Sequence, residues 1–212
     1  SVRPAAVKYA AFIFFGLAAL AGLAIVIITG HWWFLAVGAA AITAAWYYTG
    51  GKHPYGYAGL GELAVFVFFG LVATYGTAYI QIGHYSDTAI MGGVAAGLFA
   101  SAVLMVNNIR DIDLDKHVGK KTLAVKIGKR WAKALFFAMI YLPFAILVPM
   151  VLIYPATFLA FFALLLVIPV TLIVATASTP KELILALKLT SMAALVFGLL
   201  LGWGLAVVNF TV

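Results

Sequence analysis

The sequence predicts an all-α polytopic membrane protein, a bundle of about seven transmembrane helices. Of its 212 residues, 66% are hydrophobic and only 9% are charged, whereas soluble domains carry about 25% charged residues. Several uninterrupted apolar runs reach the roughly 20 residues that a transmembrane helix needs, and no stretch shows the short alternating segments of a β-barrel. The mean hydropathy of +1.16 supports the same class. We expect residues 1–212 to form a single domain.

Length and flanking polar residues place seven spans along the chain. The predicted spans, in order, are residues 6–29, 32–48, 61–82, 88–108, 132–153, 156–177 and 183–208. The connections lie near Gly30, over 49–60, 83–87 and 109–131, at Tyr154-Pro155 and near Lys181. Most connections are short, so the two long ones, 49–60 and 109–131, are the candidates for functional loops.

Basic residues test this arrangement, because cytoplasmic connections of membrane proteins collect Lys and Arg. With seven alternating spans, every Lys and Arg falls on one side. They are Arg3, Lys8, Lys52, the basic residues from Arg110 to Lys133, Lys181 and Lys188. The net charge of +7 therefore reflects orientation rather than binding to nucleic acid. We expect a multi-pass protein of the cell (inner) membrane, with a cytoplasmic N-terminus and 109–131 loop and an external C-terminus.

The chain contains no Cys. Disulfide bonds, cysteine-ligated metal clusters and a thiol nucleophile are therefore excluded. The fold must hold together without a covalent cross-link.

An acidic cluster in the 109–131 loop concentrates three of the six acidic residues of the chain. On a helical path Asn107, Asp111 and Asp115 are spaced i, i+4 and i+8, so they share one face with neighbouring side chains about 5–6 Å apart. Two carboxylates so close repel each other unless a cation lies between them. Mg²⁺ fits, since one or two carboxylates hold it while substrate phosphates and water complete its shell. Lys120 and Lys121 are candidates for the remaining phosphate charge.

A solvated interhelical loop is the alternative reading of this cluster, because charged residues in such loops commonly enforce topology alone. Asn107 and Asn108 favour the functional reading. They lie at the membrane end of an apolar span, where unpaired polar groups are costly and polar residues mark functional sites. Asp113 points to another face and is expected to be structural.

The second loop, residues 47–62, is rich in Gly and Tyr. An ordinary turn with interfacial aromatic residues is one reading, since Tyr favours the membrane boundary. In the functional reading, Lys52 or His53 meets an anionic substrate and tyrosines such as Tyr48 wall an aromatic pocket. Glu62, at the start of the third span, is expected to face the same pocket.

Two sets of segments carry a resemblance to a known family. The run Asn107–Asp111 through Asp115, followed by Gly119–Val125, resembles the second aspartate motif of the UbiA superfamily of intramembrane aromatic prenyltransferases. Tyr48–Gly51, Pro54–Tyr57 and Gly59–Phe66 resemble a stretch typical of its 1,4-dihydroxy-2-naphthoate polyprenyltransferases, the MenA enzymes.

The resemblance implies a reaction and roles for these residues. Asp111 and Asp115 are expected to hold Mg²⁺ against a polyprenyl diphosphate, with Asn107 or Asn108 assisting. Arg110, Lys120 and Lys121 would meet the charge of the leaving diphosphate. The polyprenyl group would pass to 1,4-dihydroxy-2-naphthoate with loss of CO₂, giving demethylmenaquinone. Lys52 or His53 would bind the acceptor's carboxylate, and membrane lipid would surround the apolar tail.

The resemblance also implies a longer protein. Members of the superfamily have nine spans and a first aspartate motif after the second span, whereas this chain shows seven spans and no such motif. We therefore expect a chain truncated at its N-terminus.

Three other functions remain open at this stage. A related prenyltransferase would use 4-hydroxybenzoate, homogentisate or a glycerol phosphate acceptor. An inactive fragment or lipid-binding relative would retain the aspartate motif only as structure. A transporter would require ionisable residues along a path through the membrane, whereas the charges here gather at one face.

Overall fold

The computed structural model describes residues 3–209, and that part of the chain is helical with short connections and contains no strand. The helices of the N-terminal half are α1 (Pro4–Thr29), α2 (Phe34–Thr49), η1 (Tyr55–Ala58), α3 (Gly61–Val65), η2 (Phe66–Tyr75), α4 (Gly76–Ile82) and α5 (Asp87–Arg110). Those of the C-terminal half are α6 (Ile112–His117), α7 (Leu123–Ile153), η3 (Pro155–Ala163), α8 (Leu164–Thr176) and α9 (Glu182–Asn209).

The predicted all-α membrane bundle is confirmed. Among the described residues, six helical segments are long and apolar enough to cross a membrane. They are Ala5–Thr29, Gly61–Ile82, Asp87–Arg110, Leu123–Ile153, Pro155–Thr176 and Glu182–Val207. The remaining predicted span, 32–48, corresponds to α2, which has 16 residues. At 1.5 Å per residue such a helix is about 24 Å long, a little less than the apolar thickness of a bilayer.

The fifth span starts earlier than the sequence indicated. It was expected over 132–153, but α7 begins at Leu123. The backbone leaves helical geometry inside α7 only at Gly128, where φ is 80° and ψ is 160°. The preceding turn carries Lys126, and Lys129 and Arg130 follow directly, so its charge resembled a loop. α7 therefore consists of two helices that meet at a kink at Gly128, and the long helix after the kink begins close to the predicted start at residue 132.

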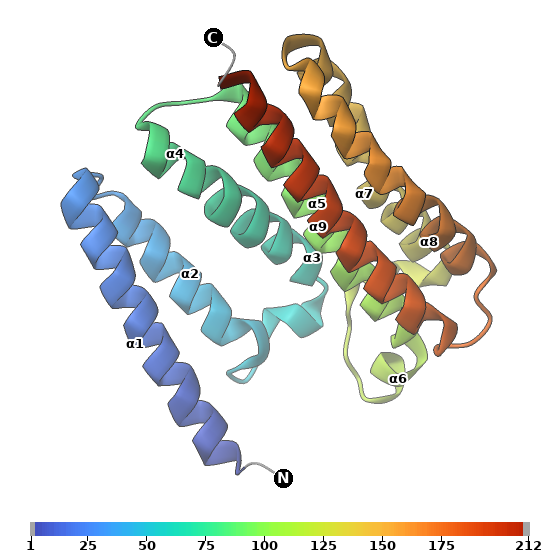
Figure 1. Cartoon of the computed structure of the whole chain (residues 1–212). Helices are drawn as coiled ribbons and strands as arrows, with labels where there is room; N and C mark the ends of the chain where they lie inside the picture. Colours follow the sequence, from blue (N-terminus) through green and yellow to red (C-terminus); the bar gives the residue numbers. More distant parts are fainter. Residues whose placement is uncertain (1–2, 210–212) are drawn as a thin grey trace.

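The helices run up and down so that both long loops lie at one end of the bundle (Figure 1). The chain's N-terminal end, the α2–α3 connection, α6 and the α8–α9 connection all lie at the bottom of this view. The C-terminal end and the remaining connections lie at the top. The basic residues that were predicted to share one side of a membrane therefore share one end of the molecule.

The core is centred on α5, which packs against η2, α7 and α9. Three buried rings, Phe99 on α5, Phe144 on α7 and Phe197 on α9, meet with centroids 5.1 to 6.1 Å apart. In contrast, only 6% of an apolar 18-residue stretch of α1 is buried. The helix that carries the acidic motif is thus held in the interior, whereas most of α1 is exposed.

Glycines allow the closest helix approach, between η2 and α5. A Cβ atom added to Gly70 would lie 2.6 Å from both the carbonyl oxygen of Gly93 and the Cα of Gly97. These neighbours are backbone atoms and cannot rotate away. Small residues permit close packing of transmembrane helices, and here they bring the π-helical η2 against the motif-bearing helix.

We expect Gly70→Ala to destabilise the protein by about 1–3 kcal/mol, the usual range for overpacking a core. Thermal unfolding in detergent measures the effect. Gly92→Ala is the matched control, because a Cβ there meets nothing within 4 Å. Equal stability of the two variants would contradict the close packing.

Candidate active site

The two long loops meet at the end of the bundle. The backbone N–H of Lys121 donates to the carbonyl of Tyr57 over 2.9 Å, and the Lys126 ammonium donates to the carbonyl of Ala58 over 2.6 Å. Gly59 completes the junction with a φ of +79°, a backbone conformation that favours glycine. These contacts join segments that are more than 60 residues apart in sequence.

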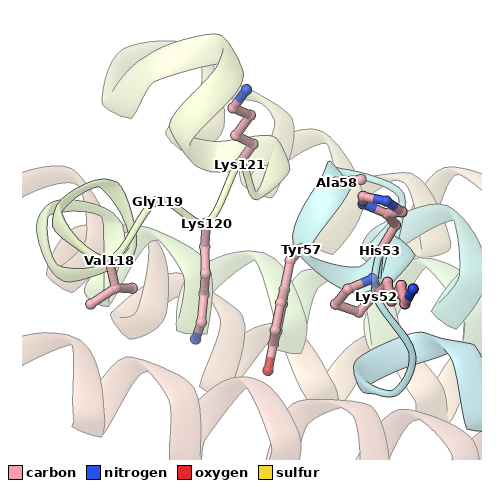
Figure 2. Close-up of a pocket in the computed structure, with 9 residues that line it drawn as sticks. Lys52, His53, Tyr57, Ala58, Val118, Gly119, Lys120 and Lys121 are labelled. Atoms are coloured by element: carbon pink, nitrogen blue, oxygen red, sulfur yellow. The ribbon is translucent and has the colours of Figure 1, made fainter.

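A cavity of about 470 Å³ lies between the loops (Figure 2). It is lined by Lys52, His53, Pro54, Tyr57 and Ala58 of one loop and by Val118, Gly119, Lys120 and Lys121 of the other. Four of these side chains are basic. A concave surface with this concentration of positive charge favours an anion such as a phosphate or carboxylate.

Among the basic residues of the cavity, Lys120 contacts both a carboxylate and an aromatic ring. Its ammonium lies 3.3 Å from Oδ1 of Asp115 and 4.8 Å from the centre of the Tyr57 ring. Figure 2 shows the Lys120 and Tyr57 side chains extending side by side, whereas Lys121 points the other way. A cation over an aromatic face is held by the ring's electrostatic field, so Lys120 is fixed between the aspartate motif and the second loop.

The aspartate motif keeps its helical spacing across the end of α5. Asp111 follows the last residue of α5, and its backbone N–H donates to the carbonyl of Asn107 over 3.1 Å. The N–H of Asp115 in turn donates to the carbonyl of Asp111 over 2.8 Å. The i, i+4, i+8 relation on which the sequence reading depended is therefore present in the backbone.

Each carboxylate of the motif has a cation of its own. The guanidinium of Arg110 makes a two-pronged contact with Asp111, at 2.7 and 2.6 Å. Asp115 is buried, with 5% of its surface exposed, and pairs with Lys120. A buried carboxylate needs such a partner, because an unpaired charge is costly there.

These donors fit a magnesium ion that shares its shell with a substrate. Among residues 3–209 no group of three or more His, Cys, Asp or Glu side chains forms a closed metal site. Mg²⁺ does not require one, since it commonly takes one or two carboxylates and completes its octahedron with phosphate oxygens and water. The carboxylates of Asp111 and Asp115 are chemically suited to such a shared shell.

Asn107 and Asn108 face different surroundings. Asn108 is buried and its amide donates to Oε1 of Glu62 over 2.8 Å. Asn107 instead lines an apolar cavity of about 440 Å³ together with Val65 and Phe69 of the third span. Glu62 was expected to face the loop pocket; it lies 3% exposed against α5 and is not among the residues that line the basic cavity.

Tyr48 lines a second apolar cavity, of about 630 Å³, between α2 and η2. The Tyr55 ring packs edge-on against the Tyr48 ring, with the ring centroids 5.6 Å apart. The Tyr55 hydroxyl donates to the carbonyl of Ala44 over 2.8 Å. Burial raises the pKa of Tyr55, so this hydroxyl remains a donor at neutral pH. Val65 and Phe69 line both apolar cavities, which therefore adjoin.

Two features of the site were missed at the sequence level. Tyr57 was not selected although its ring supports Lys120 and its carbonyl anchors Lys121. Val65 and Phe69 resembled ordinary core residues. The abundance of tyrosine in the loop was the available signal for Tyr57, but no signal distinguished the two apolar residues from their neighbours.

The model of the UbiA prenyltransferase family matches residues 4–179. This chain belongs to that family. It is similar to the 1,4-dihydroxy-2-naphthoate octaprenyltransferase of Mycobacterium tuberculosis, with 38% identity over 96% of this chain and 69% of the relative. It is also similar to the Bacillus subtilis enzyme of the same name, with 29% identity over 99% of this chain and 68% of the relative.

The Escherichia coli enzyme of the same name is 44% identical to this UbiA-family chain over 52% of the chain and 37% of the relative. The matched region thus amounts to about two thirds of the first two relatives and less of the third. No solved structure matches the chain.

We expect Gly59→Ala to weaken the junction of the two loops. A Cβ at Gly59 would lie 3.0 Å from the Lys126 side chain and 3.2 Å from the Lys121 carbonyl, in addition to the backbone cost of a positive φ. Gly119→Ala carries a similar φ of +76° without any contact within 4 Å. Gly59→Ala should therefore lower the unfolding temperature more than Gly119→Ala, and the reverse order would contradict the junction.

Proposed function

We propose that this UbiA-family protein transfers a polyprenyl group from a polyprenyl diphosphate to 1,4-dihydroxy-2-naphthoate, with Mg²⁺ and with loss of CO₂, in menaquinone biosynthesis. One observation carries the proposal. The basic cavity between the two loops lies against the aspartate motif, because Lys120 lines the cavity and pairs with Asp115. The names of the relatives supply the acceptor.

In this proposal Lys120 and Lys121 hold the diphosphate by charge. Asp111 and Asp115 hold Mg²⁺, and Arg110 orients Asp111 through its two-pronged contact. The chemistry that Mg²⁺ supplies there is neutralisation of the charge that grows on the diphosphate as the allylic C–O bond breaks. The protein's own contribution is a set of cations fixed before the substrate arrives.

The acceptor enters from the loop side. Its carboxylate would pair with Lys52 or His53, and its ring would lie near Tyr57. The diphosphate leaves with the electron pair of the C–O bond, and the carboxyl-bearing ring carbon forms the new C–C bond to the allylic carbon. The C–CO₂ bond then breaks and returns its electron pair to the ring. The ring is not oxidised in these steps, so the product is released as the hydroquinone form of demethylmenaquinone.

The polyprenyl tail would occupy the apolar cavities beside Asn107, Val65 and Phe69. Together they connect the aspartate motif with the lipid-facing surface between α2 and η2. Each CH₂ kept out of water stabilises the bound tail by about 0.8 kcal/mol. A site at the membrane boundary therefore suits a substrate with one charged end and one long apolar end.

We expect Asp111→Ala and Asp115→Ala each to abolish Mg²⁺-dependent prenyl transfer in purified membranes while leaving insertion intact. Each variant removes one of the two carboxylates that the motif supplies to the ion. The formation of product from labelled polyprenyl diphosphate and 1,4-dihydroxy-2-naphthoate measures prenyl transfer. Parent protein treated with a chelator is a second inactive control. Asp113→Ala is the control, since Asp113 is exposed. Parent-like turnover in both motif variants would remove the metal assignment.

Replacement of the basic residues Lys52 and His53 of the 47–62 loop should mainly affect binding of the acceptor. Lys52→Gln and His53→Gln are expected to raise the KM for 1,4-dihydroxy-2-naphthoate by roughly tenfold, the loss of about one charge-assisted hydrogen bond. The KM for the polyprenyl diphosphate should change less in His53→Gln. An unchanged acceptor KM in both variants would separate this loop from the acceptor.

We also propose that the loop end of the bundle faces the cytoplasm and that the protein resides in the cell (inner) membrane. The absence of Cys from the chain allows a direct test. A single Cys in place of Lys52 or Asp113 should react with a membrane-impermeant maleimide only in inverted vesicles. A Cys in place of Tyr85, at the other end, should react only from outside. Reversed labelling would overturn the orientation.

A further inference from the structure

Glu62 is the most deeply buried acidic residue among residues 3–209, with 3% of its surface exposed. Its Oε1 accepts from the amide of Asn108 over 2.8 Å, and its backbone carbonyl accepts from the hydroxyl of Ser101 over 2.9 Å. Its other oxygen, Oε2, is buried without a hydrogen-bond partner in the described part of the chain. The carboxylate therefore depends on Asn108 for its one hydrogen bond from another side chain.

These two bonds join the start of the third span to α5 at two heights. Ser101 and Asn108 are seven residues apart, about two turns or roughly 10 Å along a helix. Two ties at different heights on one face fix both the level and the rotation of one helix against another. The rotation of α5 decides where Asn107 points and how Asp111 leaves the helix.

Asn108 has little freedom of its own, since it is only 8% exposed. Its neighbour Asn107 lines the apolar cavity beside the motif, so the two amides face in different directions from adjacent positions. A hydrogen bond that holds Asn108 on Glu62 therefore also holds Asn107 toward the cavity.

We infer that Glu62 is a positioning residue: through Asn108 it sets the rotation of α5 and so places Asn107 and the aspartate motif for the Mg²⁺–diphosphate group. The inference rests on the proposed function. It assigns Glu62 no contact with the substrate, in contrast to the place in the substrate pocket that the sequence of the 47–62 loop led us to expect.

The pair has an asymmetry that makes it testable. Loss of Asn108 leaves a buried carboxylate without its side-chain partner, which costs more than the hydrogen bond itself. Replacement of both residues by apolar ones removes that penalty and can restore stability. Stability and orientation can therefore be separated by combining the two substitutions.

The experiment compares the parent with Glu62→Gln, Glu62→Leu, Asn108→Leu and the double Leu variant. For each protein the unfolding temperature, the kcat and KM of prenyl transfer, and the Mg²⁺-dependent dissociation constant of farnesyl diphosphate are measured in detergent. Ser101→Ala is the matched control, because it removes a tie to the backbone of Glu62 and leaves the carboxylate–amide bond in place.

The inference predicts that Glu62→Leu lowers kcat by up to about a hundredfold, as expected when catalytic groups shift by about 1 Å. Glu62→Gln, which keeps an acceptor oxygen for Asn108, should recover most of that loss. The double Leu variant should unfold at a higher temperature than Asn108→Leu, yet bind farnesyl diphosphate no better. Ser101→Ala should lower the unfolding temperature and lower kcat less than Glu62→Leu does, because the carboxylate–amide bond next to the motif remains.

Two results would overturn the inference. If the double variant regained turnover and binding together with stability, the pair would serve stability alone. If Glu62→Leu weakened farnesyl diphosphate binding as strongly in the Asn108→Leu background as in the parent, Glu62 would act without Asn108. A parent protein that neither binds farnesyl diphosphate nor transfers it would instead contradict the proposed function, which separates the two failures.

Discussion

The structure depends on the packing of α5 in the middle of the bundle. This helix contacts η2, α7 and α9. In its apolar 18-residue stretch 44% of the residues are buried, compared with 6% in the corresponding stretch of α1. Small residues make this possible on one side, where Gly70 meets Gly93 and Gly97, and aromatic residues fill the other. A rigid central helix matters because the acidic motif begins in its last turn. The bundle therefore presents Asn107, Asn108 and Asp111 from a fixed support.

The membrane adds a second constraint, since polar backbone groups and charges must find partners or leave the apolar layer. The start of α1, the α2–α3 connection, α6 and the α8–α9 connection, which lie in Lys- and Arg-bearing parts of the sequence, gather at the loop end (Figure 1). There a hydrogen bond from the backbone N–H of Lys121 to the carbonyl of Tyr57 joins the two long loops. The same contacts enclose the basic cavity, so one arrangement both ends the spans and gathers positive charge beside the carboxylates.

Much of this architecture could be predicted from the sequence. Apolar length gives the number of spans within the limits of one short helix, and the third predicted span, 61–82, coincides with Gly61–Ile82. The spacing of Asn107, Asp111 and Asp115 gives the continued helical path. Both are local properties, set by residues a few positions apart.

The remaining features depend on contacts between distant residues. The bond between Asn108 and Glu62 joins positions 46 residues apart, and the shared cavity of Lys52 and Lys120 requires both loops to be in place. The short helical segment of α7 before the kink at Gly128 was hidden by its charges. The π-helical geometry of η2 accompanies a close approach to α5 that composition does not show. The sequence therefore supplied candidates for the reacting residues but not the contacts that hold them in place.

The central claim is that the two loops form one site for a diphosphate. Its most direct test is chemical protection in the otherwise cysteine-free chain. His53→Cys and Val118→Cys place one thiol on each wall of the cavity, and Tyr85→Cys places one at the opposite end. A polyprenyl diphosphate with Mg²⁺ should slow maleimide labelling of the first two thiols together and leave the third unchanged. Protection of only one wall, or of neither, would contradict the account.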